Sequence, residues 1–157
     1  GGDPSEVVAL PIVGAQASDP PDLGGDGREN DADAPNAIDG DPATTWRTEG
    51  YNDRDITLLK EGVGLVLTLE QAATLDRLEI DSPTNGWRAR IYVAASPAPD
   101  LAGWGEPVAV TEGIPAGTGS IDLDDAEGTA VLVWIVDRGD APGRAAAEIS
   151  EIRAFGS

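Results

Sequence analysis

Short apolar runs, separated by turns rich in glycine and proline, make up most of this chain. In Leu75–Asp81 the apolar residues Leu78 and Ile80 fall on one face of an extended segment and charged residues on the other, the pattern of a strand with one wet side. Val63–Leu69 is apolar at most positions, which indicates a strand covered on nearly both faces. Ala130–Val136 is the most hydrophobic run and predicts a central strand. The pattern predicts an all-β protein.

Turn residues indicate how neighbouring strands pair. An Asn-Gly pair follows Leu75–Asp81 and predicts a hairpin between that segment and Trp87–Ala94. Val108–Thr111 and Gly119–Leu123 are separated by turns containing proline and glycine, and we expect them to form the next pair.

The two ends of the chain and one connection complete the predicted elements. Pro11 places the opening strand, Val7–Val13, at a sheet edge or a bend, because proline lacks the amide proton that a central strand needs. Ala147–Phe155 is expected to be the closing strand. Ala98–Gly105 predicts a short helical turn with Trp104 folded back over the core.

The length of 157 residues fits one domain with its own core. We interpret residues 1–6 as a tag remnant or linker and residues 7–157 as a single β-sandwich domain. Within it, residues 18–35 combine prolines, glycines and acids with little to bury, which predicts a long acidic loop. Loops of that length are uncommon in compact domains, so this one is either mobile or functional.

The formal net charge of −19 and a pI near 4.1 exclude some partners. Such a field repels nucleic-acid phosphates and anionic lipid, and no cluster of Lys or Arg offsets it in the sequence. We therefore expect no nucleic-acid partner. The same charge suits either cation binding or simple solubility.

The chain contains no Cys and no His. Common zinc, copper and haem ligand sets are therefore missing, as are Ser-His-Asp and Cys-His catalysis. No apolar run approaches the ~20 residues that span a bilayer, and no signal-peptide pattern is present. We expect a soluble protein or an excised soluble part of a longer one.

The stretch Asn36–Trp46 has the composition of a hard-cation loop. Asp39, Asp41 and Thr44 supply oxygen donors, and the stretch ends in a large apolar residue that can anchor it. Its spacing is not that of an EF-hand, which needs glycine at the sixth position and glutamate at the twelfth. Two interpretations stay open here: a structural calcium loop, or a solvated turn in which Asp39 caps its own backbone.

Five segments together resemble the discoidin-like, or coagulation-factor C-type, branch of the galactose-binding-domain-like superfamily. They are Ile12–Ser18, Asn36–Trp46, Gly64–Leu69, Leu75–Ile80 and Ser150–Gly156. The resemblance covers residues 10–156. It implies an eight-stranded jelly-roll β-sandwich whose chain ends lie near one another, with a structural calcium ion tying the first loop to the last strand. The implied calcium ligands are the Asn36 carbonyl, Asp39, Asp41, Thr44, the Ser150 carbonyl and Glu151.

The sugar-binding face is where the chain departs from this family. Members that bind sugars present His, Arg, Asn and an exposed aromatic residue from loops at one end of the sandwich, and this chain has no His. The candidates for ligand binding are Tyr51, Trp87, Arg88 and Trp104. For each of them, covering the edge of the core is the competing interpretation. Trp134 lies in the central strand and is expected in the core.

A narrower resemblance concerns Leu78–Gly86, Val131–Ile135 and Ala147–Ile152. These segments resemble the extracytoplasmic carboxy-terminal module of actinobacterial MviN-type proteins, lipid-linked peptidoglycan precursor flippases that also carry a kinase-like domain. The resemblance implies that the chain is the exterior domain of a membrane protein of cell-wall biosynthesis, located on the extracellular face of the membrane.

Three functions are compatible with these observations. The leading hypothesis is a non-catalytic extracytoplasmic binding module that recognises cell-wall glycan or a neighbouring protein. The alternative is a structural or protein–protein interaction domain without a sugar site, which the missing His and scarce aromatic residues favour. The third is a glycosidase with a carboxylate pair among the 29 acids, which we disfavour because abundant surface acids need no catalytic explanation.

Overall fold

The structure, a computed structural model, describes residues 7–18, 30–41, 43–58, 62–98 and 101–157. Its strands are β1 (Val8–Leu10), β2 (Ile12–Ser18), β3 (Trp46–Arg47), β4 (Val63–Ser82), β5 (Arg88–Ala94), β6 (Ala109–Val110), β7 (Gly117–Asp137), β8 (Glu148–Ile149) and β9 (Glu151–Gly156). Three short 3₁₀ helices accompany them within these ranges, η2 (Asp31–Ile38), η3 (Ile56–Leu58) and η4 (Ala102–Trp104). None of the helices in the described ranges is long and apolar enough to cross a bilayer.

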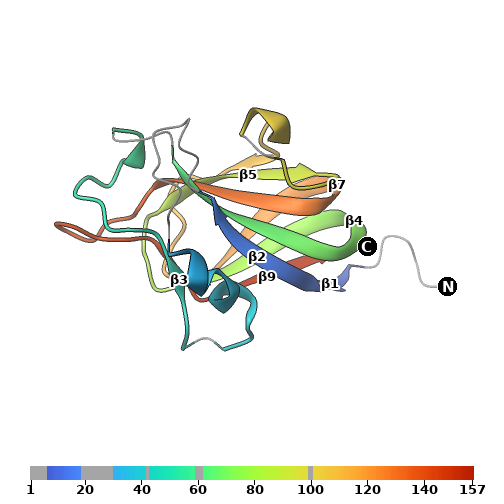
Figure 1. The fold of residues 1–157 in the computed structure, drawn as a ribbon, viewed down its shortest axis with the longest axis horizontal. Helices are drawn as coiled ribbons and strands as arrows, with labels where there is room; N and C mark the ends of the chain where they lie inside the picture. Colours follow the sequence, from blue (N-terminus) through green and yellow to red (C-terminus); the bar gives the residue numbers. More distant parts are fainter. Residues whose placement is uncertain (1–6, 19–29, 42, 59–61, 99–100) are drawn as a thin grey trace.

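Two long strands, β4 and β7, form the centre of the fold (Figure 1). They pair antiparallel along most of their length, and each bends so that it belongs to both layers of the sandwich. The first half of β4 pairs with β2, and its second half pairs with β9. β5 and β6 extend the sheet beyond β7, whereas β3 and β8 form a separate two-stranded sheet. The predicted all-β sandwich is confirmed.

Bends explain why the strands divide differently from the predicted segments. Pro11 separates β1, which pairs with β9, from β2, which pairs with β4, so the opening segment changes layers there. Asp124 and Asp125 both have positive φ angles, 53° and 56°, and mark the bend in β7. A break at Ser150 divides the closing segment into β8 and β9.

Two predicted strand pairings are wrong. The expected hairpin between Leu75–Asp81 and Trp87–Ala94 does not form, because Gly86, at a φ of 79°, lies in a connection that leads to the far side of β7. β5 therefore pairs with β7. Val108–Thr111 does not pair with Gly119–Leu123; β6 pairs with β5, and the Val108 amide donates to the Ile91 carbonyl at 2.7 Å.

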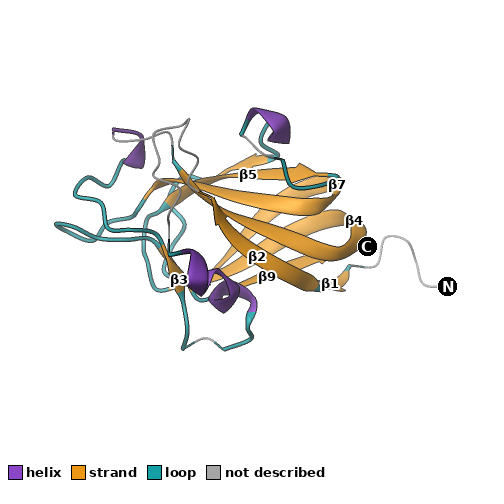
Figure 2. Ribbon diagram, viewed as in Figure 1, coloured by secondary structure: helices purple, strands orange, loops and turns teal. Residues whose placement is uncertain are grey.

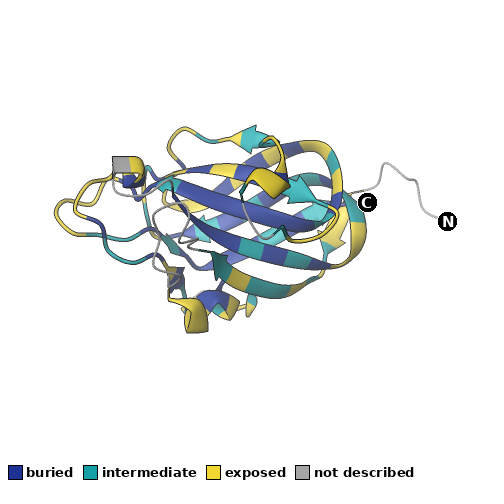
Figure 3. Cartoon of the chain, turned by 45° about the horizontal axis from the view of Figure 1, so that its top comes forward, coloured by how far each residue is buried: buried dark blue, intermediate teal, exposed yellow. Residues whose placement is uncertain are grey.

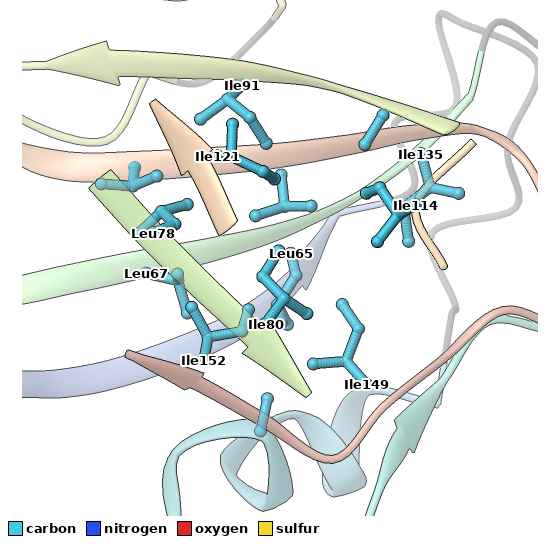
Figure 4. Packing of buried hydrophobic residues seen from close by; sticks show 14 of the residues in the cluster. Leu65, Leu67, Leu78, Ile80, Ile91, Ile114, Ile121, Ile135, Ile149 and Ile152 are labelled. Atoms are coloured by element: carbon cyan, nitrogen blue, oxygen red, sulfur yellow. The ribbon is translucent and has the colours of Figure 1, made fainter. Parts of the chain in front are cut away.

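The main core lies between the two layers and is built from alternate positions of both (Figure 4). Leu65 and Leu67 of β4 face Leu78 and Ile80 of the same strand after its bend, all at most 1% exposed. Ile152 of β9 joins them from the neighbouring strand at 2% exposure. Burial of each such side chain contributes about 1.5–3 kcal/mol, so this layer-to-layer contact dominates the stability of the fold.

A second apolar cluster covers the outer face of β5 and β7. Tyr92, Leu132 and Trp134 lie on these strands, and Trp104 of η4 packs over them. Because this part of β7 is covered on both faces, every residue from 130 to 135 is buried (Figure 3). The predictions of a central strand, a core Trp134 and a folded-back Trp104 are confirmed.

The predicted acidic loop at residues 18–35 needs a correction at both ends. Ser18 is the last residue of β2. From Asp31 the chain forms η2, because Ala34 and Ala37 are small and apolar and pack into the main core at 0% exposure. Residues 19–29 and the predicted tag remnant or linker, residues 1–6, lie outside the described residues.

The two ends of the described chain lie side by side. Val8 of β1 is paired with Gly156 of β9, which confirms the expected proximity of the ends. Both lie at one end of the sandwich, whereas the long connections around β3 gather at the opposite end (Figures 1 and 2). This second region, formed by the connections at residues 47–58, 83–87, 111–116 and 138–147, is called the loop end below.

Candidate functional site

Three adjoining hollows open at the loop end. The first, of about 470 Å³, is lined by Arg47, Pro83, Thr84, Asn85, Asp140, Ala141, Ala145, Ala146 and Glu148. The second, of about 390 Å³, is lined by Asn30, Arg47, Thr48, Glu49, Gly50, Arg144, Ala145 and Ala146. The third, of about 450 Å³, is lined by Arg54, Gly86, Arg88, Glu112, Gly113 and Asp140. Because Arg47, Ala145 and Ala146 border both of the first two, these form one continuous polar surface.

A buried arginine holds the loops of this end in place. Arg138 is 3% exposed, and its guanidinium donates to five backbone carbonyls. These carbonyls belong to Tyr51 (2.7 Å), Gly139 (2.9 Å), Ala141 (2.7 Å), Asn52 (2.9 Å) and Gly143 (2.6 Å). A guanidinium has five N–H donors, so all are used. The sequence offered one signal for this role, a cation directly after the most apolar strand, and we did not predict it.

A second network connects the strand ends beneath the third hollow. Asp137, buried at the end of β7, accepts from Arg54 Nε at 3.2 Å and lies 3.4 Å from Arg88 Nε. Arg54 also contacts Asp140 at 2.5 Å, and Asp140 accepts from Asn85 Nδ2 at 2.8 Å. Hydrogen bonding to Asp137 raises the pKa of Arg54, so the guanidinium stays charged. The Arg54–Asp140 ion pair and the Asn85–Asp140 hydrogen bond join residues 54, 85 and 140 at the edge of the first hollow.

Of the predicted ligand-binding residues, only Arg88 is exposed. Trp87 is 0% exposed and lies in the main core, so it has no face free to stack on a sugar. Tyr51 is 6% exposed, and its backbone pairs with Ala145. Trp104 is 5% exposed in the second cluster, away from the loop end. The candidate role of these three aromatic side chains as a stacking surface is therefore corrected, because burying a large aromatic ring in the core is more favourable than exposing it.

The predicted calcium ligands are brought together in part. Glu151, 8% exposed at the start of β9, accepts from the Gly40 amide at 2.6 Å, which joins the first loop to the last strand. Asp39 accepts from the Thr44 hydroxyl at 2.5 Å, and its carboxylate lies within interaction distance of Glu151. The Thr44 hydroxyl lowers the pKa of Asp39, whereas burial raises the pKa of Glu151 and the nearby Asp39 reinforces that rise. Two carboxylates thus meet where an opposite charge would stabilise both.

The remaining predicted ligands lie around this pair. The side chain of Asn36 donates to the Thr45 carbonyl at 3.0 Å, and the Ser150 amide donates to the Asp81 carbonyl at 2.7 Å. Neither bond involves the carbonyl oxygens that were the predicted ligands. Asp41 is exposed; its carboxylate accepts from the Ala43 amide at 2.9 Å, and its own amide donates to Asp39 at 2.9 Å. No group of three acidic side chains placed to hold a metal ion occurs among the described residues. Of the six predicted ligands, the structure brings together the side chains of Asp39, Thr44 and Glu151, whose oxygens are of the kind that a hard cation prefers.

No family model matches the sequence. Solved structures are similar over almost the whole chain. The family 32 carbohydrate-binding module of AlyQ, solved with 4,5-unsaturated mannuronic acid, is 17% identical, with 96% of this chain and 99% of that one covered and a TM-score of 0.61. The family 32 module of NanJ from Clostridium perfringens, solved with galactose, is 16% identical, with 96% and 99% covered and a TM-score of 0.63.

The chain has the fold of these carbohydrate-binding modules. A chitosan-binding module from Paenibacillus sp. IK-5 is also similar, at 19% identity, with 91% of this chain and 93% of that one covered and a TM-score of 0.60. The three saccharides named for these structures differ from one another. The shared fold therefore does not determine which saccharide such a module binds.

Proposed function

We propose that this chain is a non-catalytic glycan-binding module that takes its ligand at the loop end. The observation that carries the proposal is the continuous pair of hollows around Arg47, with Thr84, Asn85 and Glu148 on its rim. Hydroxyl, amide, carboxylate and guanidinium groups are the donors and acceptors that sugar hydroxyls require. Arg138 connects the two loops next to this surface through its bonds to the Tyr51 and Gly143 carbonyls. The saccharides named for the three structurally similar modules support the same ligand class.

Filling the hollow tests this proposal. Ala146 is half-buried and borders both hollows, so Ala146→Trp is expected to abolish binding on a glycan panel that includes peptidoglycan fragments. The matched control is Ala102→Trp, an exposed position on η4, which should bind like the unaltered protein. Isothermal titration calorimetry measures the affinity of both variants for the glycan that the unaltered protein binds most tightly on the panel. Binding that survives Ala146→Trp would place the glycan elsewhere, and a panel without any bound glycan would leave the protein–protein interaction alternative, which the burial of the aromatic candidates favours.

The proposed setting is the extracellular face of the cell membrane, with the module tethered to a membrane protein of cell-wall biosynthesis and a cell-wall glycan as its ligand. Its support is the resemblance of Leu78–Gly86, Val131–Ile135 and Ala147–Ile152 to the MviN-type module. The chain has no Cys, so a cysteine at Val110, which is 62% exposed, is the one label site that this chain contributes, and the parent protein without it gives the background. Labelling by a membrane-impermeant maleimide supports this location, and protection until lysis contradicts it.

We further propose that a structural calcium ion binds at Asp39, Thr44 and Glu151. The supporting observation is the meeting of two carboxylates from distant parts of the chain, with the Gly40–Glu151 bond joining residues 111 apart. Calcium would neutralise this pair, and hard oxygen ligands suit it. Its contribution would be stability through mass action, because the site offers no reacting group for the ion to activate.

Calcium should reverse the effect of Glu151→Gln on the Tm. Burial raises the pKa of Glu151, so ionisation of this carboxyl group lowers the stability of the metal-free folded state as the pH rises. Glu151→Gln keeps an acceptor for the Gly40 amide and removes this ionisation. In metal-free protein at pH 7 we expect an unchanged or higher Tm. With millimolar calcium, the unaltered protein should gain about 5–10 °C at 100 times its Kd, and Glu151→Gln and Asp39→Asn should both lose that gain.

Thermal unfolding in EDTA and in calcium makes this comparison. Glu106→Gln, at an exposed position outside the site, is the control and should keep the full calcium effect. If calcium stabilises none of the four proteins, residues 39–44 form a turn capped by Asp39, whose carboxylate already accepts from the Asp41 amide at 2.9 Å.

A further inference from the structure

We propose that the ligand is an acidic saccharide whose carboxylate is bound between Arg47 and Arg144. This inference rests on the proposed function and names the ligand class of the same site. Both arginines line the second hollow of the loop end, and both are exposed.

Most described arginines already have acceptors within the protein. Arg54, Arg77, Arg88 and Arg153 form ion pairs, and Arg138 donates to backbone carbonyls. Within the ranges that the structure describes, the guanidinium groups of Arg47, Arg90 and Arg144 have neither a hydrogen bond nor an ion pair, and two of these three border the same hollow. In a chain with 29 acids and 10 bases, this hollow is a place where the overall negative charge is locally offset.

Hydrogen bonds hold the backbone segments that carry these two arginines. Arg47 lies in β3, paired with Glu148 of β8, and its carbonyl accepts from Asn30 Nδ2 at 2.8 Å. The segment that carries Arg144 is joined to the opposite wall by reciprocal bonds between the Tyr51 and Ala145 backbones, at 2.8 and 3.1 Å. Binding an anion therefore orders the two side chains but does not have to order the backbone that carries them.

Gly50 allows Arg144 to lie along the wall of the hollow. A Cβ at position 50 would lie 3.0 Å from Arg144 Nε and 3.1 Å from its Cγ, so any larger residue there would require the arginine to shift by a few tenths of an ångström. Glu49 also borders the hollow. Two positive charges and one negative charge suit a ligand with one anionic group better than a highly charged polyanion.

The chemistry favours a sugar carboxylate. Guanidinium binds carboxylate through paired, charge-assisted hydrogen bonds, which are stronger than bonds to neutral hydroxyls. Ala145 and Ala146 line both the first and the second hollow, so they offer an apolar surface for the sugar ring beside the arginines. A uronic acid residue combines both requirements in one unit.

Matched acid and ester ligands test the inference. The methyl glycosides of galacturonic, glucuronic and mannuronic acid carry one carboxylate each. They are titrated calorimetrically beside their methyl esters and beside a neutral sugar that carries one sulfate. We expect at least one acid to bind about 10-fold more tightly than its ester and to weaken with added salt. Arg47→Gln and Arg144→Gln should each lower the affinity for that acid about 10-fold, and so reduce the preference for the acid over its ester. Arg90→Gln, with an equally unpaired side chain outside the hollow, should change neither.

Several outcomes would overturn this inference. Equal affinity for acid and ester, or binding that is indifferent to both substitutions at the hollow, would show that the module binds glycan without a carboxylate contact and would leave the proposed function intact. Tight arginine-dependent binding of the sulfated ligand alone would overturn the carboxylate assignment. A protein that binds none of these saccharides, and none on the glycan panel, would overturn both the inference and the proposed function.

Discussion

Arg138→Met is expected to lower the free energy of unfolding by about 4 kcal/mol. The substitution keeps an unbranched apolar stem but removes the donors to five carbonyls, two of them in the connection after β3 and three in the connection after β7. Each bond to a charged donor contributes on the order of 1.5–3 kcal/mol, and water that enters the loop end recovers part of the sum. Urea unfolding followed by tryptophan fluorescence gives the difference.

Two further substitutions serve as comparisons for Arg138→Met. Arg138→Lys keeps the charge with fewer donors in a different geometry, so we expect an intermediate loss of stability. Arg90→Met removes an exposed guanidinium that has no hydrogen bond among the described residues, and the stability of this variant should differ by no more than about 0.5 kcal/mol. A loss below about 1 kcal/mol for Arg138→Met would mean that the loops keep their positions without this residue.

Trp87→Ala is expected to cost about 4 kcal/mol of stability. The ring is fully buried in the main core, next to the start of β5, and its loss leaves a cavity that the two packed layers cannot close. The same substitution separates the two interpretations of this residue. A stacking surface would lose glycan binding with little change in stability, whereas a core residue loses stability.

Trp87→Phe refines the measurement. Trp87 Nε1 is the sole buried side-chain nitrogen or oxygen of the described residues without a hydrogen-bond partner, so phenylalanine removes an unsatisfied donor as well as volume. We expect it to cost much less than alanine, about 1–2 kcal/mol. Chemical unfolding combined with calorimetric titration of glycan measures both properties. Full stability of Trp87→Ala would contradict the core assignment.

Much of the fold could be predicted because strands leave a local signal. The alternation of Leu78 and Ile80 with charged neighbours, and the continuous apolar run at residues 130–136, identify strands without reference to anything distant. The loop with Asp39 was also visible in the sequence, since its donors and glycine are close together. What these signals lack is the partner of each strand, because pairing depends on where the chain bends.

The loop end was predicted least well because its contacts are distant in sequence and mediated by backbone. The Arg138 guanidinium binds the backbone carbonyl of Tyr51, 87 residues away. Every residue has such a carbonyl, so the sequence does not indicate which ones the arginine binds. Burial of Trp87 likewise depends on the packing of both layers. The pairing state of Arg47 and Arg144 follows from which acids lie near them, a property of the folded chain alone.

The side-by-side ends of the described chain, opposite the loop end, determine how such a module would present itself on a carrier. A linker joined at either end would hold the hollows outward, and insertion into a loop of another domain would need little spacing between the two junctions. Several copies on one carrier would therefore face a polymeric ligand together. Avidity then converts modest single-site affinities into firm attachment, by raising the effective concentration of each further site.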